Sequence, residues 1–187
     1  MITVNTKALE KALQGTKRSL DNEMKIAINR TVRATATDMN KRVREDVALK
    51  ARDVRKTIST RKSPGGKEQN GQVRLAHEKR LPLKYFNANH IRRGVSYRIS
   101  KGEGRKLVRG GFMGPRAGAM AVKLRGHAFK RKGKKRLPIQ KLMGVSPWGV
   151  FDQNNMKPEQ QEFARKRLAY ELGRRVEFNT LKKKGLI

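Results

Sequence analysis

The residues best suited to catalysis or metal binding are few in this chain, and they are scattered. None of the three histidines, His77, His90 and His127, has a partner at the spacing that protein zinc sites use. The three carboxylates of the central segment 61–150 form no evident pair for acid–base chemistry. The glycine-rich sequences RGGFMG and KGEG match neither a P-loop nor a dinucleotide fingerprint. We therefore expect no catalytic centre, no metal site and no cofactor, and we do not expect an enzyme.

Basic side chains are the other candidates for chemistry, because they can bind phosphate or carboxylate groups. Six of the seven residues from Lys130 to Arg136 are basic. Few aromatic residues that could stack on bases stand near them, and the chain has no zinc-finger, helix-turn-helix or RNP-type motif. The run therefore has two interpretations at this point: a patch that binds nucleic acid, or a solvated loop that faces an acidic protein. The candidate contact residues are Lys130, Arg131, Lys132, Lys134, Lys135, Arg136, Arg92, Arg93, Arg105 and Lys106.

The charge of the whole chain points to an acidic partner. The 187 residues include 47 Lys and Arg against 15 Asp and Glu, a formal net charge of +32. Segment 61–150 alone carries 24 basic and 3 acidic residues, a net charge of +21. Self-repulsion at this density destabilises a compact monomer, so nucleic acid or acidic protein surfaces are expected to neutralise it. The hydrophobic share of 36% provides a lean core, and the absence of cysteine excludes disulfides.

Two long amphipathic helices are expected to flank the basic centre. Apolar residues recur every four positions in the N-terminal part, which predicts helices near 6–18 and 20–48 with a break around Gly15 and Ser19. A similar stripe predicts a C-terminal helix near 158–183, opened by Pro158. Such stripes are usually core or subunit contacts, and a membrane-surface face is the less favoured interpretation. The residues expected to pack in the core or against another subunit are Leu20, Met24, Ile28, Val32, Trp148, Leu168, Leu172 and Val176.

The centre of the chain alternates with the period of β-strands. GVSYRIS and RKLVRG, separated by the turn KGEG, predict a hairpin, and QVRLAHEKR, AMAVKLRG and RLPIQKLM offer further short strands. The phrase LPIQKLMGVSPWG is expected to form a strand and a buried loop anchored by Trp148. We predict an α+β fold with N-terminal long helices, a central antiparallel β-sheet or small open barrel, and a long C-terminal helix. These parts form one expected domain, 1–187, made of helices in 1–58, a β-rich basic centre in 72–150 and a helix in 157–184.

The sequence predicts neither a secretory signal in its first residues nor a membrane-spanning segment. The first residues, MITVNTKALEKALQGTKRSL, lack the apolar core of a secretory signal. No window approaches 18 uninterrupted apolar residues, so no transmembrane segment and no membrane partner are expected.

Several sequence phrases resemble one family in the same order along the chain. KIAINRTVRATATDMNKRVRED followed by KARDVRKTI resembles the N-terminal region of phage minor tail protein Z, also described as a tail completion or neck protein. LPLKYFNA and RLPIQKLMGVSP are similar to the late central segment of that family, which leads into its last helix.

The resemblance implies a structural role in a virion. Members of the family join the tail at its head-proximal end, and a ring of subunits, six-fold or twelve-fold, is expected there. Neighbouring partners would be tail tube or terminator proteins and head-connector proteins, with the genome end as a further contact. The protein would then reside in the tail or neck of the virion, after assembly in the host cytoplasm. The rival interpretation is a non-enzymatic nucleic-acid-binding protein of ribosomal or DNA-packaging type, whereas a nuclease subunit would need a carboxylate cluster.

Overall fold

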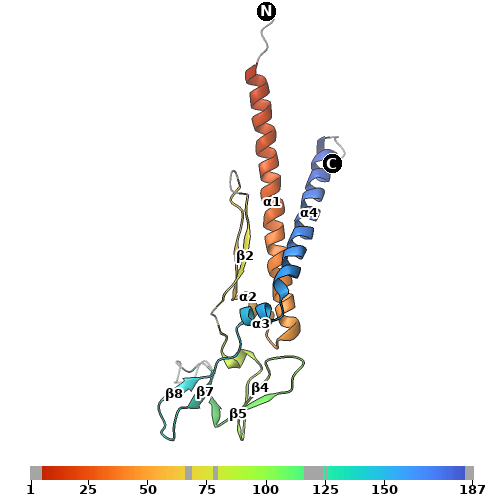
Figure 1. The fold of residues 1–187 in the computed structure, drawn as a ribbon. Coiled ribbons are helices and arrows are strands. Elements are labelled where there is room, and N and C mark those ends of the chain that lie inside the picture. The colour runs from red at the N-terminus through yellow and green to blue at the C-terminus, as the bar shows by residue number, and fades with distance from the viewer. Residues whose placement is uncertain (1–5, 66–68, 78–79, 116–123, 125, 184–187) are drawn as a thin grey trace, which may run out of the picture. The chain divides into compact units, whose positions relative to one another are not determined.

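Long helices at both ends of the chain and short antiparallel strands between them make up the fold. The computed structural model describes residues 6–65, 69–77, 80–115, 124 and 126–183, with side chains between 19 and 182 (Figure 1). The helices are α1 (Thr6–Asp46), α2 (Ala51–Arg55), the 3-10 helix η1 (Leu83–Tyr85), α3 (Pro147–Gln153) and α4 (Met156–Lys183). The strands are β1 (Ile58–Arg61), β2 (Gln72–Leu75), β3 (Asn89–Ile91), β4 (Gly94–Tyr97), β5 (Lys106–Arg109), β6 (Gly111–Met113), β7 (Ala128–Arg131) and β8 (Ile139–Lys141). The α+β class is confirmed.

The chain divides into two compact units. Unit 1 consists of Met1–Asp38, Thr60–Arg74 and Pro158–Ile187, and unit 2 consists of Met39–Ser59 and Leu75–Lys157. Helix α1 and the β1–β2 pair therefore contribute residues to both units.

Helix α1 runs without the predicted break. The chain is helical from Thr6 to Asp46, through Gly15 and Ser19, so the prediction of two helices was wrong. A lone glycine in a helix interior costs about 1 kcal/mol relative to alanine, and good helix formers such as Ala12, Leu13 and Lys17 surround it here. One glycine is therefore too weak a signal to end a helix of this length.

In unit 1 the extended residues 60–65 and 69–74 lie along α1 (Figure 1). The amide of Asn29 and the backbone of Ser63 exchange two hydrogen bonds, of 2.8 and 3.3 Å. At Gly71 an added Cβ would lie 2.5 Å from Val32 and 2.9 Å from Ile28, so the missing side chain permits this close approach. Residues Ile58–Arg61 form β1 and pair with β2, although the sequence predicted strands only within 72–150.

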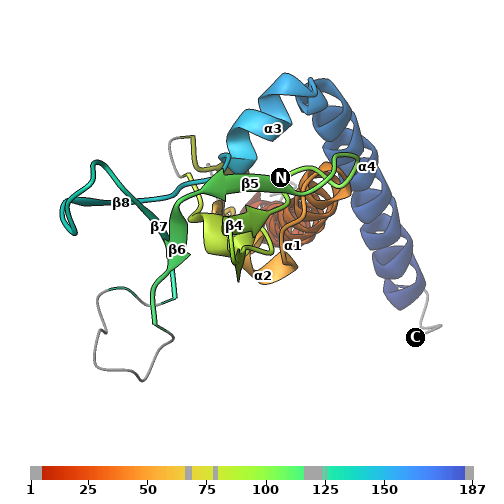
Figure 2. The same cartoon turned by 90° about the horizontal axis from the view of Figure 1, so that it is seen from below.

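The described residues of unit 2 form two three-stranded antiparallel sheets, with strand orders β3-β4-β5 and β6-β7-β8. Figure 2 shows β5 leading into β6, while β7 and β8 extend away from β4 and β5. The predicted strands at GVSYRIS, RKLVRG and RLPIQKLM are present as β4, β5 and β8, whereas the sequence AMAVKLRG falls almost entirely outside the described residues. Strand β7 was not predicted, because its AFKR sequence alternates too briefly.

Most of the buried apolar side chains of the described chain belong to unit 2. Among them Val43, Val54, Phe86 and Val95 are wholly buried. The phrase LPIQKLMGVSPWG forms β8 and then, at Pro147, the short helix α3 instead of the expected buried loop, because proline favours the first turn of a helix. Trp148 lies in α3, with its ring centroid 5.2 Å from that of His77 and 6.4 Å from that of Phe151.

A substitution at Gly144 tests how tightly this phrase packs on the core. A Cβ at Gly144 would lie 2.3 Å from the Phe86 ring, which is fully buried and has no room to move away. Gly144→Ala is therefore expected to cost about 1–3 kcal/mol. The control is Gly149→Ala in α3, where no atom lies within 4 Å of an added Cβ. Thermal unfolding should show a lower Tm for the Gly144 variant alone; equal melting temperatures would contradict this packing.

Candidate nucleic-acid or acidic-partner interface

The basic run from Lys130 to Arg136 forms the turn of a β-hairpin. Phe129, Lys130 and Arg131 of β7 pair with Lys141, Gln140 and Ile139 of β8. The Lys132 amide donates a 3.1 Å hydrogen bond to the Pro138 carbonyl, which closes the loop. All six basic side chains of the run are exposed.

A corner between two sheets brings a second basic turn to this hairpin. Gly94, after the β3–β4 turn that carries Arg92 and Arg93, pairs with Arg109 of β5. The Gly110 amide donates to the Arg93 carbonyl, and the next residue, Gly111, pairs with Lys130 of β7. Three residues of backbone therefore link the two basic turns. We call the exposed cations of this region the basic corner: Arg92, Arg93, Arg109, Lys130, Arg131, Lys132, Lys134, Lys135 and Arg136.

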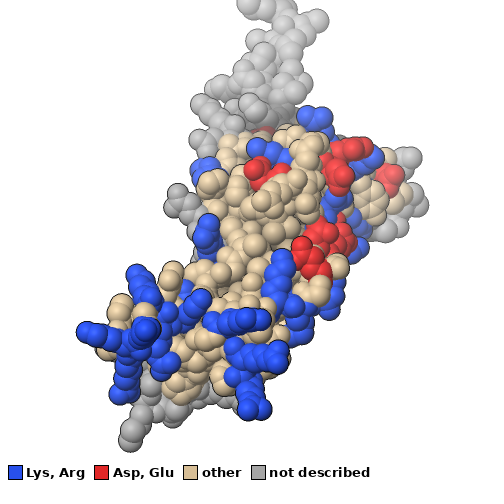
Figure 3. Space-filling model, turned by 60° about the horizontal axis from the view of Figure 1, so that its bottom comes forward, with Lys and Arg blue, Asp and Glu red and all other residues tan. Residues whose placement is uncertain are grey.

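The basic corner has no acidic partner among the residues that the structure describes. None of its nine side chains lies within 4.0 Å of a described carboxylate. Figure 3 shows Lys and Arg side chains spread over the β-rich part of unit 2, at the lower left of the picture. The Arg131 guanidinium lies 5.3 Å from the centroid of the Phe112 ring, which itself stacks on Phe129 at 5.9 Å. The surface therefore presents unneutralised charge to whatever covers it.

Arg105 and Lys106 lie apart from the basic corner, although the sequence grouped them with it. Lys106 pairs with Tyr97 at the end of β5 opposite Arg109, about 10 Å away at the usual rise per strand residue. Arg105 donates hydrogen bonds to the Ser96 hydroxyl at 2.8 Å and to the Asn87 carbonyl at 2.7 Å, so it holds the β3–β4 sheet to its neighbouring loop.

The charge of Lys106 is likewise paired with a group of the same chain. Its ammonium lies 2.6 Å from the Glu103 carboxylate, and this hydrogen-bonded charge raises the pKa of Lys106 above its ordinary value. Both side chains are largely exposed, so the pair contributes little to stability. Because the pKa is raised, whatever it contributes is present at neutral pH and is lost only as the pH rises through that pKa.

The apolar residues expected to pack are exposed to different degrees within the chain. Val32 is 5% exposed, and Ile28, Leu168, Leu172 and Trp148 are half-buried. Leu20 and Met24 of α1 are exposed, and Val176 of α4 is 66% exposed. The apolar face of α1 around Leu20 and Met24, and that of α4 around Val176, are therefore open to solvent within the single chain.

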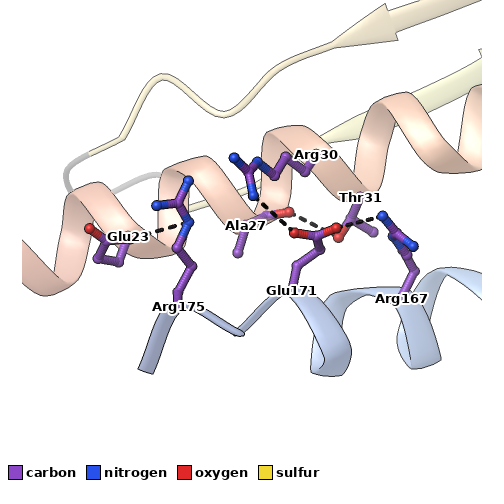
Figure 4. A network of polar contacts seen from close by, with 7 residues as sticks. All are labelled: Glu23, Ala27, Arg30, Thr31, Arg167, Glu171 and Arg175. Carbon is purple, nitrogen blue, oxygen red and sulfur yellow. Dashed lines mark hydrogen bonds and ion pairs between the residues drawn. The ribbon is translucent and has the colours of Figure 1, made fainter. Parts of the chain in front are cut away.

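A buried carboxylate between α1 and α4 is the main feature that the sequence patterns missed. The side chain of Glu171 is 1% exposed and receives Arg30 at 3.5 Å and Arg167 at 2.6 Å (Figure 4). Nearby, Arg175 and Glu23 form a second ion pair at 3.4 Å. The helical spacing offered a signal, because Glu171 stands three residues after Leu168 and so shares its face of α4.

Neither a cluster of metal ligands nor a membrane-spanning helix is found among the described residues. Within them, no group of three or more His, Cys, Asp or Glu side chains is placed to hold a metal ion. No helix among the described residues is long and apolar enough to cross a membrane.

The described chain thus combines long terminal helices with a basic, β-rich unit 2. The model of the family described as Prophage minor tail protein Z (GPZ) matches residues 6–183. The chain belongs to this family and is thus a structural protein of a phage tail. No curated protein and no solved structure matches the chain.

Proposed function

We propose that the protein is a tail completion or neck component that forms a ring at the head-proximal end of the tail and joins the tail to the head. It has no enzymatic activity in this role, and its function is to assemble. Membership of the minor tail protein Z family supports a tail component. Beyond this, we propose the position at the neck and a ring of six-fold or twelve-fold symmetry.

The observation that carries the proposal is the exposure of apolar side chains in unit 1. Of the buried apolar side chains in the described part of the chain, unit 1 holds only Ala27 and Val32. Among its described residues the same unit exposes six large apolar side chains, namely Leu20, Met24, Tyr170, Val176, Phe178 and Leu181. A unit that exposes more large apolar side chains than it buries is stabilised by a neighbour.

The spacing of these residues supports another copy of the chain as that neighbour. Tyr170, Phe178 and Leu181 follow one another at intervals of eight and three residues, which places them along one side of α4. In a closed ring each copy presents such a side to a different surface of the next copy, and Leu20 with Met24 on α1 provides a second apolar surface.

Replacement of apolar residues on α4 tests the ring. Phe178→Ser combined with Leu181→Ser is expected to weaken self-association about 100-fold, because the loss of two buried side chains costs about 3 kcal/mol. The control is Gln161→Ser combined with Arg165→Ser, two exposed polar residues of the same helix. Native mass spectrometry and analytical ultracentrifugation of the full chain give the populations of ring and monomer. A wild-type chain that stays monomeric at tens of micromolar, or equal effects of both double variants, would count against the proposal.

A further inference from the structure

The basic corner is the strongest unassigned binding surface of the described chain. We propose that it binds the phosphate backbone of double-stranded DNA without reading the base sequence. This inference rests on the proposed function for its setting and names the partner that the neck protein would hold through this surface.

The distribution of charge favours a polyanion with regularly spaced charges. Nine exposed cations come from two turns and from the ends of β5 and β7, which the Gly110–Gly111 corner brings together. None of them is neutralised by a carboxylate of the described chain, so their charge is available to a ligand. Duplex DNA carries one negative charge per about 1.7 Å of its axis and releases counterions when such cations approach it.

The composition of the surface favours DNA over an acidic protein. Protein interfaces have an apolar, aromatic-rich centre from which lysine is depleted. The two turns of the basic corner expose two large apolar side chains, Ile91 and Leu137, against nine cations. Three of the cations in the hairpin loop are lysines, which suit phosphate as compact point charges.

The positions of the aromatic residues favour a duplex over a single strand. Proteins that hold single strands stack bases on exposed aromatic rings. Here Phe86 and Phe129 are buried, and the Arg131 guanidinium lies over the Phe112 ring. The basic corner thus offers charge for a backbone, and no exposed aromatic ring stands among its described residues. Without base contacts the binding is independent of sequence.

The test is a salt titration of DNA binding by the full-length protein. The binding variant replaces the three loop lysines, Lys132, Lys134 and Lys135, by Gln. The control variant removes the same charge from unit 2 outside the basic corner, at the exposed Lys41, Lys50 and Arg55, also by Gln. Fluorescence anisotropy follows a labelled random-sequence 24-base-pair duplex, a single strand of the same length and a poly-glutamate peptide, between about 0.05 and 0.3 M NaCl.

The expected result is a loss that is specific to the loop and to the duplex. Each phosphate contact adds about 0.9 to the salt exponent, so the loop variant should bind the duplex roughly 100-fold more weakly at 0.15 M salt. Its slope of log K against log salt should fall by about two to three, and the control variant should stay within about threefold of wild type. Duplexes rich in A·T and in G·C should bind about equally, and the single strand no tighter than the duplex.

Three outcomes would overturn the inference. They are the absence of duplex binding by the wild-type protein at 0.05 M salt, equal losses in the loop and control variants, and tighter loop-dependent binding of poly-glutamate than of DNA. The last outcome would assign the surface to an acidic protein. The proposed ring is tested separately, by measuring the oligomeric state of the same loop variant. A loop variant that still forms rings but loses DNA supports both proposals, and one that binds DNA poorly as a monomer shows that the ring, not the surface, was lost.

Discussion

Gly94→Ala is expected to be the most damaging single substitution in unit 2. Gly94 opens β4 with a φ of +143°, a conformation that side chains with a Cβ rarely adopt. A Cβ there would lie 2.1 Å from the carbonyl oxygen of Val108, which is backbone in the paired strand β5 and cannot rotate away. The β4–β5 pairing would have to open, at a cost of more than about 3 kcal/mol.

The measurement is thermal unfolding followed by circular dichroism. For a chain of this size, 1 kcal/mol corresponds to about 2–4 °C, so Tm should fall by at least about 6 °C. Gly110→Ala is the matched control, because Gly110 also has a positive φ, of +69°, but no atom within 4 Å of an added Cβ. It should cost only the strain of the left-handed conformation, about 1–2 kcal/mol. If both variants melted alike, the collision with Val108 would not be what constrains Gly94.

Glu171→Ala is expected to have the largest effect in unit 1. The substitution removes a carboxylate that is 1% exposed and leaves Arg30 and Arg167 without it. Breaking a buried ion pair from one side usually costs about 3–5 kcal/mol. The two arginine side chains are 46% and 39% exposed and can turn toward water, so we expect a lower cost of about 2–3 kcal/mol.

The matched control is another glutamate of α4 with a basic partner. Glu162 pairs with Lys166 at 2.7 Å, and both side chains are exposed, so Glu162→Ala should cost less than about 1 kcal/mol. Urea unfolding gives both free energies, and Glu171→Gln, which keeps the shape without the charge, should fall between them. A Glu171→Ala variant as stable as Glu162→Ala would mean that the buried network does not hold α4 on α1.

The helices were predictable because their signals are local. Apolar residues four apart, such as Ile28 and Val32, mark the inner face of α1 in any context. The break predicted at Gly15 was wrong because a glycine costs a helix only about 1 kcal/mol, which is too little to end a helix of 41 residues. The role of Glu171 was missed for the opposite reason: its spacing places it on the face of Leu168, but its burial also depends on Arg30, which comes from another helix.

The basic corner was only half predictable. The sequence shows how much charge the run from Lys130 to Arg136 carries, but not which other cations join it. That depends on pairing between distant strands, in which Gly110 and Gly111 connect the turn at Arg93 to the strand at Lys130. The same pairing separates Lys106, which looked equivalent in the sequence, and adds Arg109, which no pattern singled out.

Electron cryomicroscopy of virions is the most direct test of the proposed neck ring. We expect a closed ring of copies of this chain at the head-proximal end of the tail, and tails that fail to join heads when the gene is deleted. Virions that lack the chain, or that carry it only at the distal tip of the tail, would contradict the account.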